Sequence, residues 1–142
     1  IKLKLSSAQA TIGDGSSATV NITDNDAPPT VAFTLANSSA NESVASPDTV
    51  VVQLSAVSGQ KVTVKYGVSK TGTNASSKTD YTLASGTLTF LPGETMKTVP
   101  LVIKDDSLLE ADETLRIVLS SPTAAILGPI TSHIFTILND DV

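Results

Sequence analysis

Short runs in which apolar and polar residues alternate recur along most of this chain, and they constrain its fold more than any other feature. Alternation with a period of two is typical of a β-strand that buries one face. Turn-forming residues such as Ser58–Gln60 and Leu91–Glu94 separate the runs. The predicted strands are Val31–Leu35, Thr49–Leu54, Lys61–Val68, Gly86–Phe90, Lys97–Ile103, Thr114–Leu119 and Ser132–Leu138. They predict an all-β protein, a seven-stranded antiparallel β-sandwich.

A strongly acidic turn joins two of these strands. The segment Lys104–Glu113 reads KDDSLLEADE and carries five carboxylates in ten residues. Carboxylates this close repel one another unless positive charge lies among them, and only Lys104 and Arg116 lie nearby in the sequence. Calcium is the cation that prefers such hard oxygen ligands. The turn therefore predicts a calcium site, with a solvated acidic surface as the alternative interpretation.

Other carboxylates are expected to converge on the same turn. If consecutive strands run alternately up and down, every second strand ends at one edge of the sandwich, which we call the rim. The acidic residues predicted there, and hence the predicted calcium ligands, are Glu42, Asp80, Asp105, Asp106, Glu110, Glu113, Asp140 and Asp141, which are eight of the 14 acidic residues in the chain. Asp112 faces the opposite way from Glu113 in an extended chain, so we expect it to face solvent.

The composition excludes several classes of function. A net charge of -5 over 142 residues argues against nucleic-acid binding, which needs a basic surface. The chain has no Cys for disulfides or thiolate zinc sites, and no apolar run approaches the roughly 20 residues of a membrane span. Paired carboxylates could hydrolyse glycosides, but aromatic residues are only 4%. The single histidine, His133, lies inside a predicted strand and is expected to be an ordinary strand residue, either packed or on the surface. We therefore expect no enzyme.

The start of the chain repeats its end. Leu5–Ser7 matches Leu119–Ser121, and Ile22–Asp26 matches Ile137–Asp141 with one residue of gap. This predicts three units: residues 1–26 as the C-terminal hairpin of a preceding repeat, 27–30 as a linker with two prolines, and 31–142 as one complete domain of a tandem array. An isolated hairpin is marginally stable in water. We expect this one to be disordered, to pack on the complete domain, or to form a dimer by pairing with a second molecule.

A family resemblance rests on an ordered set of short motifs. They are Asp80-Tyr81, Ser85–Phe90 (SGTLTF), Pro92–Thr95 (PGET), Asp105-Asp106 with Glu110 and Glu113, Leu119–Pro122 (LSSP), and Asn139–Asp141. Over about Thr30–Val142 the chain resembles a Calx-β domain, the module of sodium/calcium exchangers and of many bacterial surface proteins. The resemblance implies an immunoglobulin-like sandwich whose distal carboxylates, here the eight named above, bind several calcium ions. Exchanger modules carry an acid where this chain has Asn139, which implies fewer ions or weaker binding.

The sequence leaves more than one function open. The leading hypothesis is a calcium-binding structural repeat of a large secreted or cell-surface protein, bacterial and adhesin-like, in which calcium rigidifies the distal loops and the joint between repeats. Its partners would be the neighbouring repeats of the same chain, and its location extracellular. The alternatives are a regulatory calcium-sensor module of a membrane transporter such as a sodium/calcium exchanger, and a spacer that binds no ion.

Overall fold

Strands make up all the regular secondary structure that the computed structural model describes, which covers residues 2–4, 13–15, 17–22, 26–47 and 49–142. In these ranges no helix has the length and apolarity to cross a membrane. The strands are β1 (Lys2–Lys4), β2 (Ser17–Thr19), β3 (Thr30–Phe33), β4 (Asn37–Asn41), β5 (Val51–Leu54), β6 (Val62–Ser69), β7 (Tyr81–Thr82), β8 (Gly86–Phe90), β9 (Met96–Thr98), β10 (Val102–Ile103), β11 (Glu113–Thr123), β12 (Ile126–Leu127) and β13 (Ser132–Leu138).

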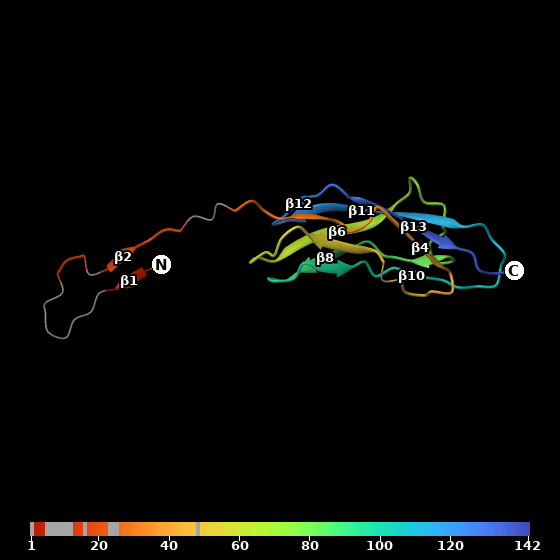
Figure 1. The fold of residues 1–142 in the computed structure, drawn as a ribbon, viewed down its shortest axis with the longest axis horizontal. Helices are drawn as coiled ribbons and strands as arrows, with labels where there is room; N and C mark the ends of the chain where they lie inside the picture. Colours follow the sequence, from red (N-terminus) through yellow and green to blue (C-terminus); the bar gives the residue numbers. More distant parts are fainter. Residues whose placement is uncertain (1, 5–12, 16, 23–25, 48) are drawn as a thin grey trace.

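Two sheets form the two layers of a sandwich (Figure 1). One sheet has the strand order β4-β13-β11-β6-β8, and the other has the order β12-β3-β5-β9. A short antiparallel pair, β7 with β10, lies at the end where the chain stops. The prediction of an all-β sandwich is confirmed.

The core lies between the facing sheets, and alternation along each strand determines which residues enter it. In β11 the buried positions are Leu115, Ile117 and Leu119, and in β13 they are His133, Phe135 and Ile137. The opposing sheet contributes apolar residues of the same kind, including Val31, Phe33, Val52 and Leu54. Full burial of such a side chain contributes about 1.5–3 kcal/mol, so this interior is what holds the two layers together.

The structure departs from the expected strands and their pairing in several ways, and short strands such as β7 and β12 were not expected. The first predicted strand is followed by β4, in a stretch for which no strand was predicted. The strand predicted over Lys97–Ile103 is divided into β9 and β10, with Pro100, which has no N–H to donate, between them. Two pairings, β4 with β13 and β12 with β3, are parallel rather than antiparallel.

The start of the chain forms a separate two-stranded sheet outside the sandwich (Figure 1). In it β1 pairs with β2 in antiparallel register, from Lys2 opposite Thr19 to Lys4 opposite Ser17. Residues 5–12 and 23–25 of the predicted hairpin, Asp24 among them, lie outside the described residues. The division into 1–26, 27–30 and 31–142 stays a prediction, as does pairing of the hairpin with a second molecule.

Candidate functional site: an acidic rim

At the rim, three strands of the larger sheet begin or finish with polar residues whose side chains continue the inward-facing series of the strand. Glu113 precedes Leu115 by two residues on β11, so its side chain faces the same way as that buried leucine. Glu42 continues the inner positions of β4 and is itself only 6% exposed. Asn139 continues the series of buried positions on β13 that ends at Ile137. The rim therefore closes one end of the core with polar groups.

The small β7–β10 pair brings Asp80 to this rim. Tyr81 and Ile103 are opposite each other in the pair, and both side chains are buried. Just outside the pair, the amide of Lys104 donates to the carbonyl oxygen of Asp80 over 2.8 Å. Two segments far apart in the sequence are thus fixed together beside the acidic turn.

Six of the eight predicted ligands lie in two clusters. Glu42, Asp106 and Asp141 form one cluster, and Asp80, Glu110 and Glu113 form the other. In each cluster one carboxylate oxygen from every member lies within 4.8 Å of the others. Calcium binds oxygen at about 2.3–2.6 Å, so two oxygens on opposite sides of one ion are roughly 4.6–5.2 Å apart. Both clusters are therefore close enough for their members to share a calcium ion.

The buried oxygens of the first cluster also fit a cation. Within the described part of the chain, Glu42 Oε1 and Asp141 Oδ2 are the buried side-chain oxygens without a hydrogen-bond partner. A buried carboxylate oxygen without a partner is costly, and a cation would satisfy it. The residues present thus fit calcium, and they would supply carboxylate ligands from three separate segments.

The pKa shifts at the rim reflect crowding of negative charge. Burial and then the approach of Asp80, Glu110 and Glu42 raise the pKa of Glu113 to about 7. For Asp80, burial opposes ionisation, but hydrogen bonds from Ser76, Glu113 and Thr79 together lower its pKa. When Glu113 is protonated, its carboxyl group can donate to the ionised carboxylate of Asp80.

Glu42 shows the same effect in the first cluster. Burial is the main cause that raises its pKa, and the negative charges of Asp141, Asp106 and Asp140 add to the rise. A backbone hydrogen bond from Asp140 acts in the opposite direction. A cation bound to these carboxylates would lower the raised pKa of Glu42, because positive charge favours the ionised form.

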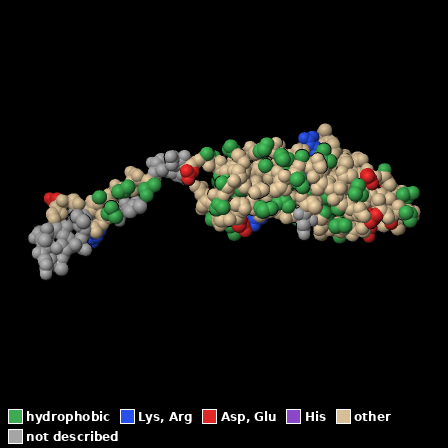
Figure 2. Space-filling view, in the orientation of Figure 1, with side chains coloured by type: hydrophobic (Ala, Val, Ile, Leu, Met, Phe, Trp, Pro, Cys, Tyr) green, Lys and Arg blue, Asp and Glu red, His purple; other side chains and the backbone are tan. Residues whose placement is uncertain are grey.

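Members of both clusters line one small cavity. Its wall contains Glu42 and Asp106 from the first cluster, Asp80, Glu110 and Glu113 from the second, and also Lys104, Ala111, Ile137 and Asn139. The cavity volume is about 10 Å³, which is roughly the space of one water-sized sphere. An ion there would be held by the carboxylates directly, because a complete hydration shell does not fit. Figure 2 shows acidic side chains near this end of the sandwich.

Two predicted ligands lie outside the clusters. Asp105 is exposed and belongs to neither of them. Asp140 is also exposed, and its Oδ2 accepts a hydrogen bond from the Ser43 hydroxyl over 2.6 Å. This contact joins the end of β13 to the segment after β4, so Asp140 contributes to the shape of the rim through Ser43.

Two polar contacts that were not predicted from the sequence hold the acidic turn in place. Asn139 Oδ1 accepts from the amide of Glu110 over 3.0 Å, and the Asn139 amide donates to Asp112 Oδ1 over 3.2 Å. Asp112 is exposed, as expected, but it also binds the chain at the end of β13. The signal for this contact is the register, since Glu113 lies opposite Ile137 and Asp112 must therefore lie near Asn139.

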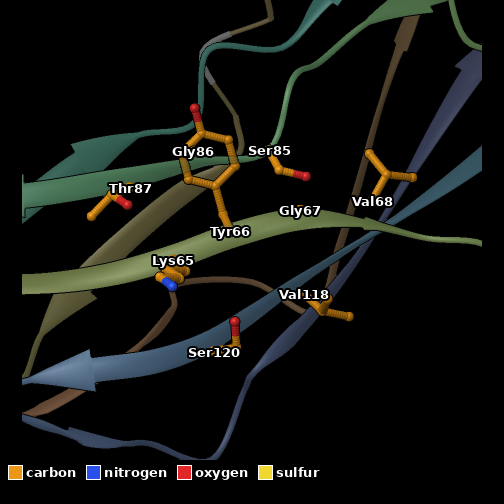
Figure 3. Close-up of a pocket in the computed structure, with 9 residues that line it drawn as sticks. All are labelled: Lys65, Tyr66, Gly67, Val68, Ser85, Gly86, Thr87, Val118 and Ser120. Carbon is orange, nitrogen blue, oxygen red and sulfur yellow. The ribbon is translucent and has the colours of Figure 1, made fainter.

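A second hollow lies on the larger sheet, away from the rim (Figure 3). Lys65, Tyr66 and Gly67 of β6, Gly86 and Thr87 of β8, and Val118 and Ser120 of β11 line it with Val68 and Ser85. Tyr66 lies opposite Gly86 in the ladder, and its ring occupies the space that a side chain at Gly86 would need. This aromatic cover over a strand glycine explains Tyr66 structurally.

Comparisons with known proteins agree with the fold. The sequence profile of the Calx-beta domain family matches residues 24–141. The crystal structure of the apo-form Calx CBD1 domain is similar with a TM-score of 0.71 and 24% identity, covering 80% of this chain and 98% of that one. CBD12 from CALX1.2 gives a TM-score of 0.71 and 25% identity, covering 79% of this chain and 44% of that one.

Two curated relatives match shorter stretches. Adhesion G-protein coupled receptor V1 of Danio rerio is 44% identical over 64 residues, which is 44% of this chain. Extracellular matrix protein 3 of Lytechinus variegatus is 50% identical over 38 residues, or 27% of this chain. The chain spans about 1% of the length of each of these relatives. The family profile matches most of the chain, and with the sandwich and its acidic rim this places the protein in the Calx-beta domain family.

Proposed function

We propose that this Calx-beta module is a calcium-binding structural repeat of a large extracellular or cell-surface protein. The observation that supports calcium binding most directly is the buried Glu42, whose Oε1 has no hydrogen-bond partner and which lies beside Asp106 and Asp141. An extracellular location is supported by the kinds of protein that match, an adhesion receptor and a matrix protein. These relatives come from a fish and a sea urchin, so the bacterial source expected from the sequence finds no support among them.

Calcium would act by neutralising charge and joining segments. The first cluster takes one residue from the end of β4, one from the acidic turn and one from the chain after β13. The second takes Asp80 from just before β7 and two residues from the acidic turn and the start of β11. Ions in both clusters would replace repulsion among these segments with shared coordination, and the free energy of binding would add to the stability of the fold.

The same ions would stiffen the joint between repeats. By the internal repeat, Asp26 corresponds to Asp141, so the rim of a preceding repeat would end at Asp26. Only Ala27–Pro29 separate that rim from β3, a span of at most roughly 14 Å. Two prolines also restrict this short linker. The rim of one repeat would therefore face the next repeat directly.

The tip of the acidic turn supports a contact at that joint. Leu108 is 60% exposed and Leu109 is 74% exposed, and they lie between the cluster residues Asp106 and Glu110. At the opposite end of the sandwich Val57 is 67% exposed, in a loop that lines a hollow with the linker. A following repeat could cover the two leucines with its own copy of that apolar end.

Thermal unfolding with calcium and with excess chelator tests the proposal, at fixed ionic strength and with magnesium as a control. We expect calcium to raise the melting temperature by about 5 °C or more, since saturation at 100 times Kd adds about 2.7 kcal/mol. Asp106→Asn should lose most of this rise. Asp14→Asn makes the same change of charge outside the sandwich and should keep it. Equal melting temperatures in calcium, magnesium and chelator would contradict calcium binding and leave the spacer function.

A regulatory calcium-sensor module of a membrane transporter is the second candidate. It is favoured by the solved structures that resemble this chain, which are Calx domains. Modules of this family also occur in sodium/calcium exchangers. The flanking sequence of the full-length protein separates the two candidates. Transmembrane helices next to the module would support the sensor, and further repeats of the module would support the structural array.

A further inference from the structure

The strand that carries Glu42 has little apolar attachment to the rest of the protein. Strand β4 reads NSSAN, and of its residues only Ala40 packs against the hydrophobic core. It lies at the edge of its sheet and pairs with β13 alone. A strand held mainly by one backbone ladder opens more easily than a core strand. Something polar must therefore supply the attachment that the side chains of β4 lack.

His133 supplies two hydrogen bonds to this segment from inside the protein. The imidazole is fully buried, and its Nδ1 lies 2.8 Å from the carbonyl oxygen of Leu35. Its Nε2 lies 2.8 Å from the hydroxyl oxygen of Ser38. Leu35 lies in the crossing between the two sheets, and Ser38 lies on β4 itself. One side chain on β13 thus forms hydrogen bonds both to the segment that leads into β4 and to β4 itself.

The chemistry of the partners fixes the proton on the ring. A carbonyl oxygen only accepts, so Nδ1 carries the hydrogen and donates to Leu35. In the neutral ring Nε2 then accepts from the Ser38 hydroxyl, and the Thr49 hydroxyl lies 3.1 Å from that same oxygen and can donate to it. Burial lowers the pKa of His133, which keeps the ring neutral although the Leu35 carbonyl acts in the opposite direction.

We propose that His133 is a positioning residue for the acidic rim. It holds β4 in register on β13, and this register places Glu42 in its cluster. The register connects the two ends directly: the ladder runs from Asn37 opposite Ile134 to Asn41 opposite Leu138. The next amide, that of Glu42, donates to the Leu138 carbonyl over 3.0 Å. Loosening the strand at His133 would therefore free Glu42 at its other end. The effect on calcium affinity rests on the proposed function, but the effect on Glu42 does not.

Amide hydrogen exchange in chelator tests the positioning role without any calcium. His133→Phe keeps a ring of similar size and removes both hydrogen bonds. We expect the Glu42 and β4 amides to exchange about tenfold faster or more, with a smaller change in β11 and β6. The control is Val62→Ala on β6, which removes fully buried apolar volume away from β4. If Val62→Ala lowers the melting temperature as much as His133→Phe does, it should still leave the ratio of the β4 to the β11 exchange rates unchanged.

A double-mutant cycle with Ser38→Ala assigns the effect to the contact. Ser38→Ala alone should speed exchange at Glu42, and it should add little in the His133→Phe background, because the shared bond is already lost. Exchange that rises evenly over the whole sandwich in His133→Phe, as in Val62→Ala, would overturn the proposal and leave His133 as a general stabiliser.

Calcium titration calorimetry then separates this inference from the proposed function. If the wild-type protein binds calcium, His133→Phe should weaken binding by about tenfold at a temperature where it is fully folded. Unchanged affinity in that variant would overturn the positioning role. If the wild-type protein binds no calcium, the proposed function fails by itself, and selective exchange at Glu42 still supports His133 as the residue that places it.

Discussion

Glu113 and Asp112 are neighbours in the sequence, yet they meet different surroundings at the start of β11. Glu113 has the same phase as Leu115 and Ile117, so its carboxyl group lies over the end of the core and its pKa rises to about 7. Asp112 has the opposite phase and stays exposed. The alternation of side chains along a strand was enough to predict that Glu113 and Asp112 face opposite ways. The proximity of Glu113 to Asp80 was not predictable, because Asp80 comes from a loop distant in the sequence.

The raised pKa of Glu113 predicts how the stability of the calcium-free protein depends on pH. Its pKa is about 7 in the folded state, against an ordinary value of 4.5. Between these values the folded protein holds a proton that the unfolded chain has released, so the free energy of unfolding should fall as pH rises from 4.5 to 7. Above about pH 7 this contribution should be constant.

Urea unfolding in chelator from pH 5 to pH 8 measures this effect. Glu113→Gln cannot ionise, so its free energy of unfolding should fall less over this range than that of the wild type, and it should be the more stable protein at pH 8. Parallel curves for the two proteins would show that Glu113 titrates normally in the folded state.

Asp105 and Asp106 give a sharper test of the clusters, since the sequence predicted both as ligands. Only Asp106 lies in a cluster, while Asp105 is exposed and outside both. We expect Asp106→Asn to weaken calcium binding by about tenfold or more, through loss of a charge in contact with the ion. Asp105→Asn should have the smaller effect. Titration calorimetry on both variants decides, and equal losses would mean that the acidic turn rearranges around the ion.

At the scale of elements, the sequence predicted best those strands whose residues alternate in polarity. Strands β6, β8, β11 and β13 each bury alternate residues over at least part of their length, and all four were expected. Strand β4 was not, since NSSAN contains no large apolar residue and its place depends on backbone pairing and on His133. The parallel pairings were also missed, because alternation gives the buried face of a strand and not the direction of its neighbour.

A packed pair of strands gives a prediction at this scale. A Cβ atom built on Gly86 would lie 2.8 Å from Cζ of Tyr66, so Gly86→Ala must displace the ring from its place over β8. We expect a loss of stability of about 1–3 kcal/mol, measured by urea unfolding. Gly59→Ala is the control, because nothing lies within 4 Å of the added atom. A similar stability for both variants would show that the ring moves without cost.

At the scale of the whole molecule, the sandwich has its linker at one end and its acidic rim at the other (Figure 1). The placing of the linker and the rim at opposite ends was predictable from the sequence, since carboxylates follow alternate strands and two prolines precede the first strand of the sandwich. The grouping of six carboxylates into two clusters depended on side-chain geometry that alternation does not give. It arises because β4, the β7–β10 pair and β13 all end at the rim.

The parallel pairing of β4 with β13 has a mechanical consequence for a repeat in a tandem array. Tension would enter through β3 and leave through the chain after β13, so it would pull β4 and β13 in opposite directions along their length. The evenly spaced hydrogen bonds of this ladder would then be loaded in shear, all at once, instead of being unzipped one by one. Glu42 and Asp141, at the ends of the two strands, belong to one cluster. A calcium ion between them would lock the strands against sliding, and single-molecule pulling should show a higher unfolding force in calcium than in chelator.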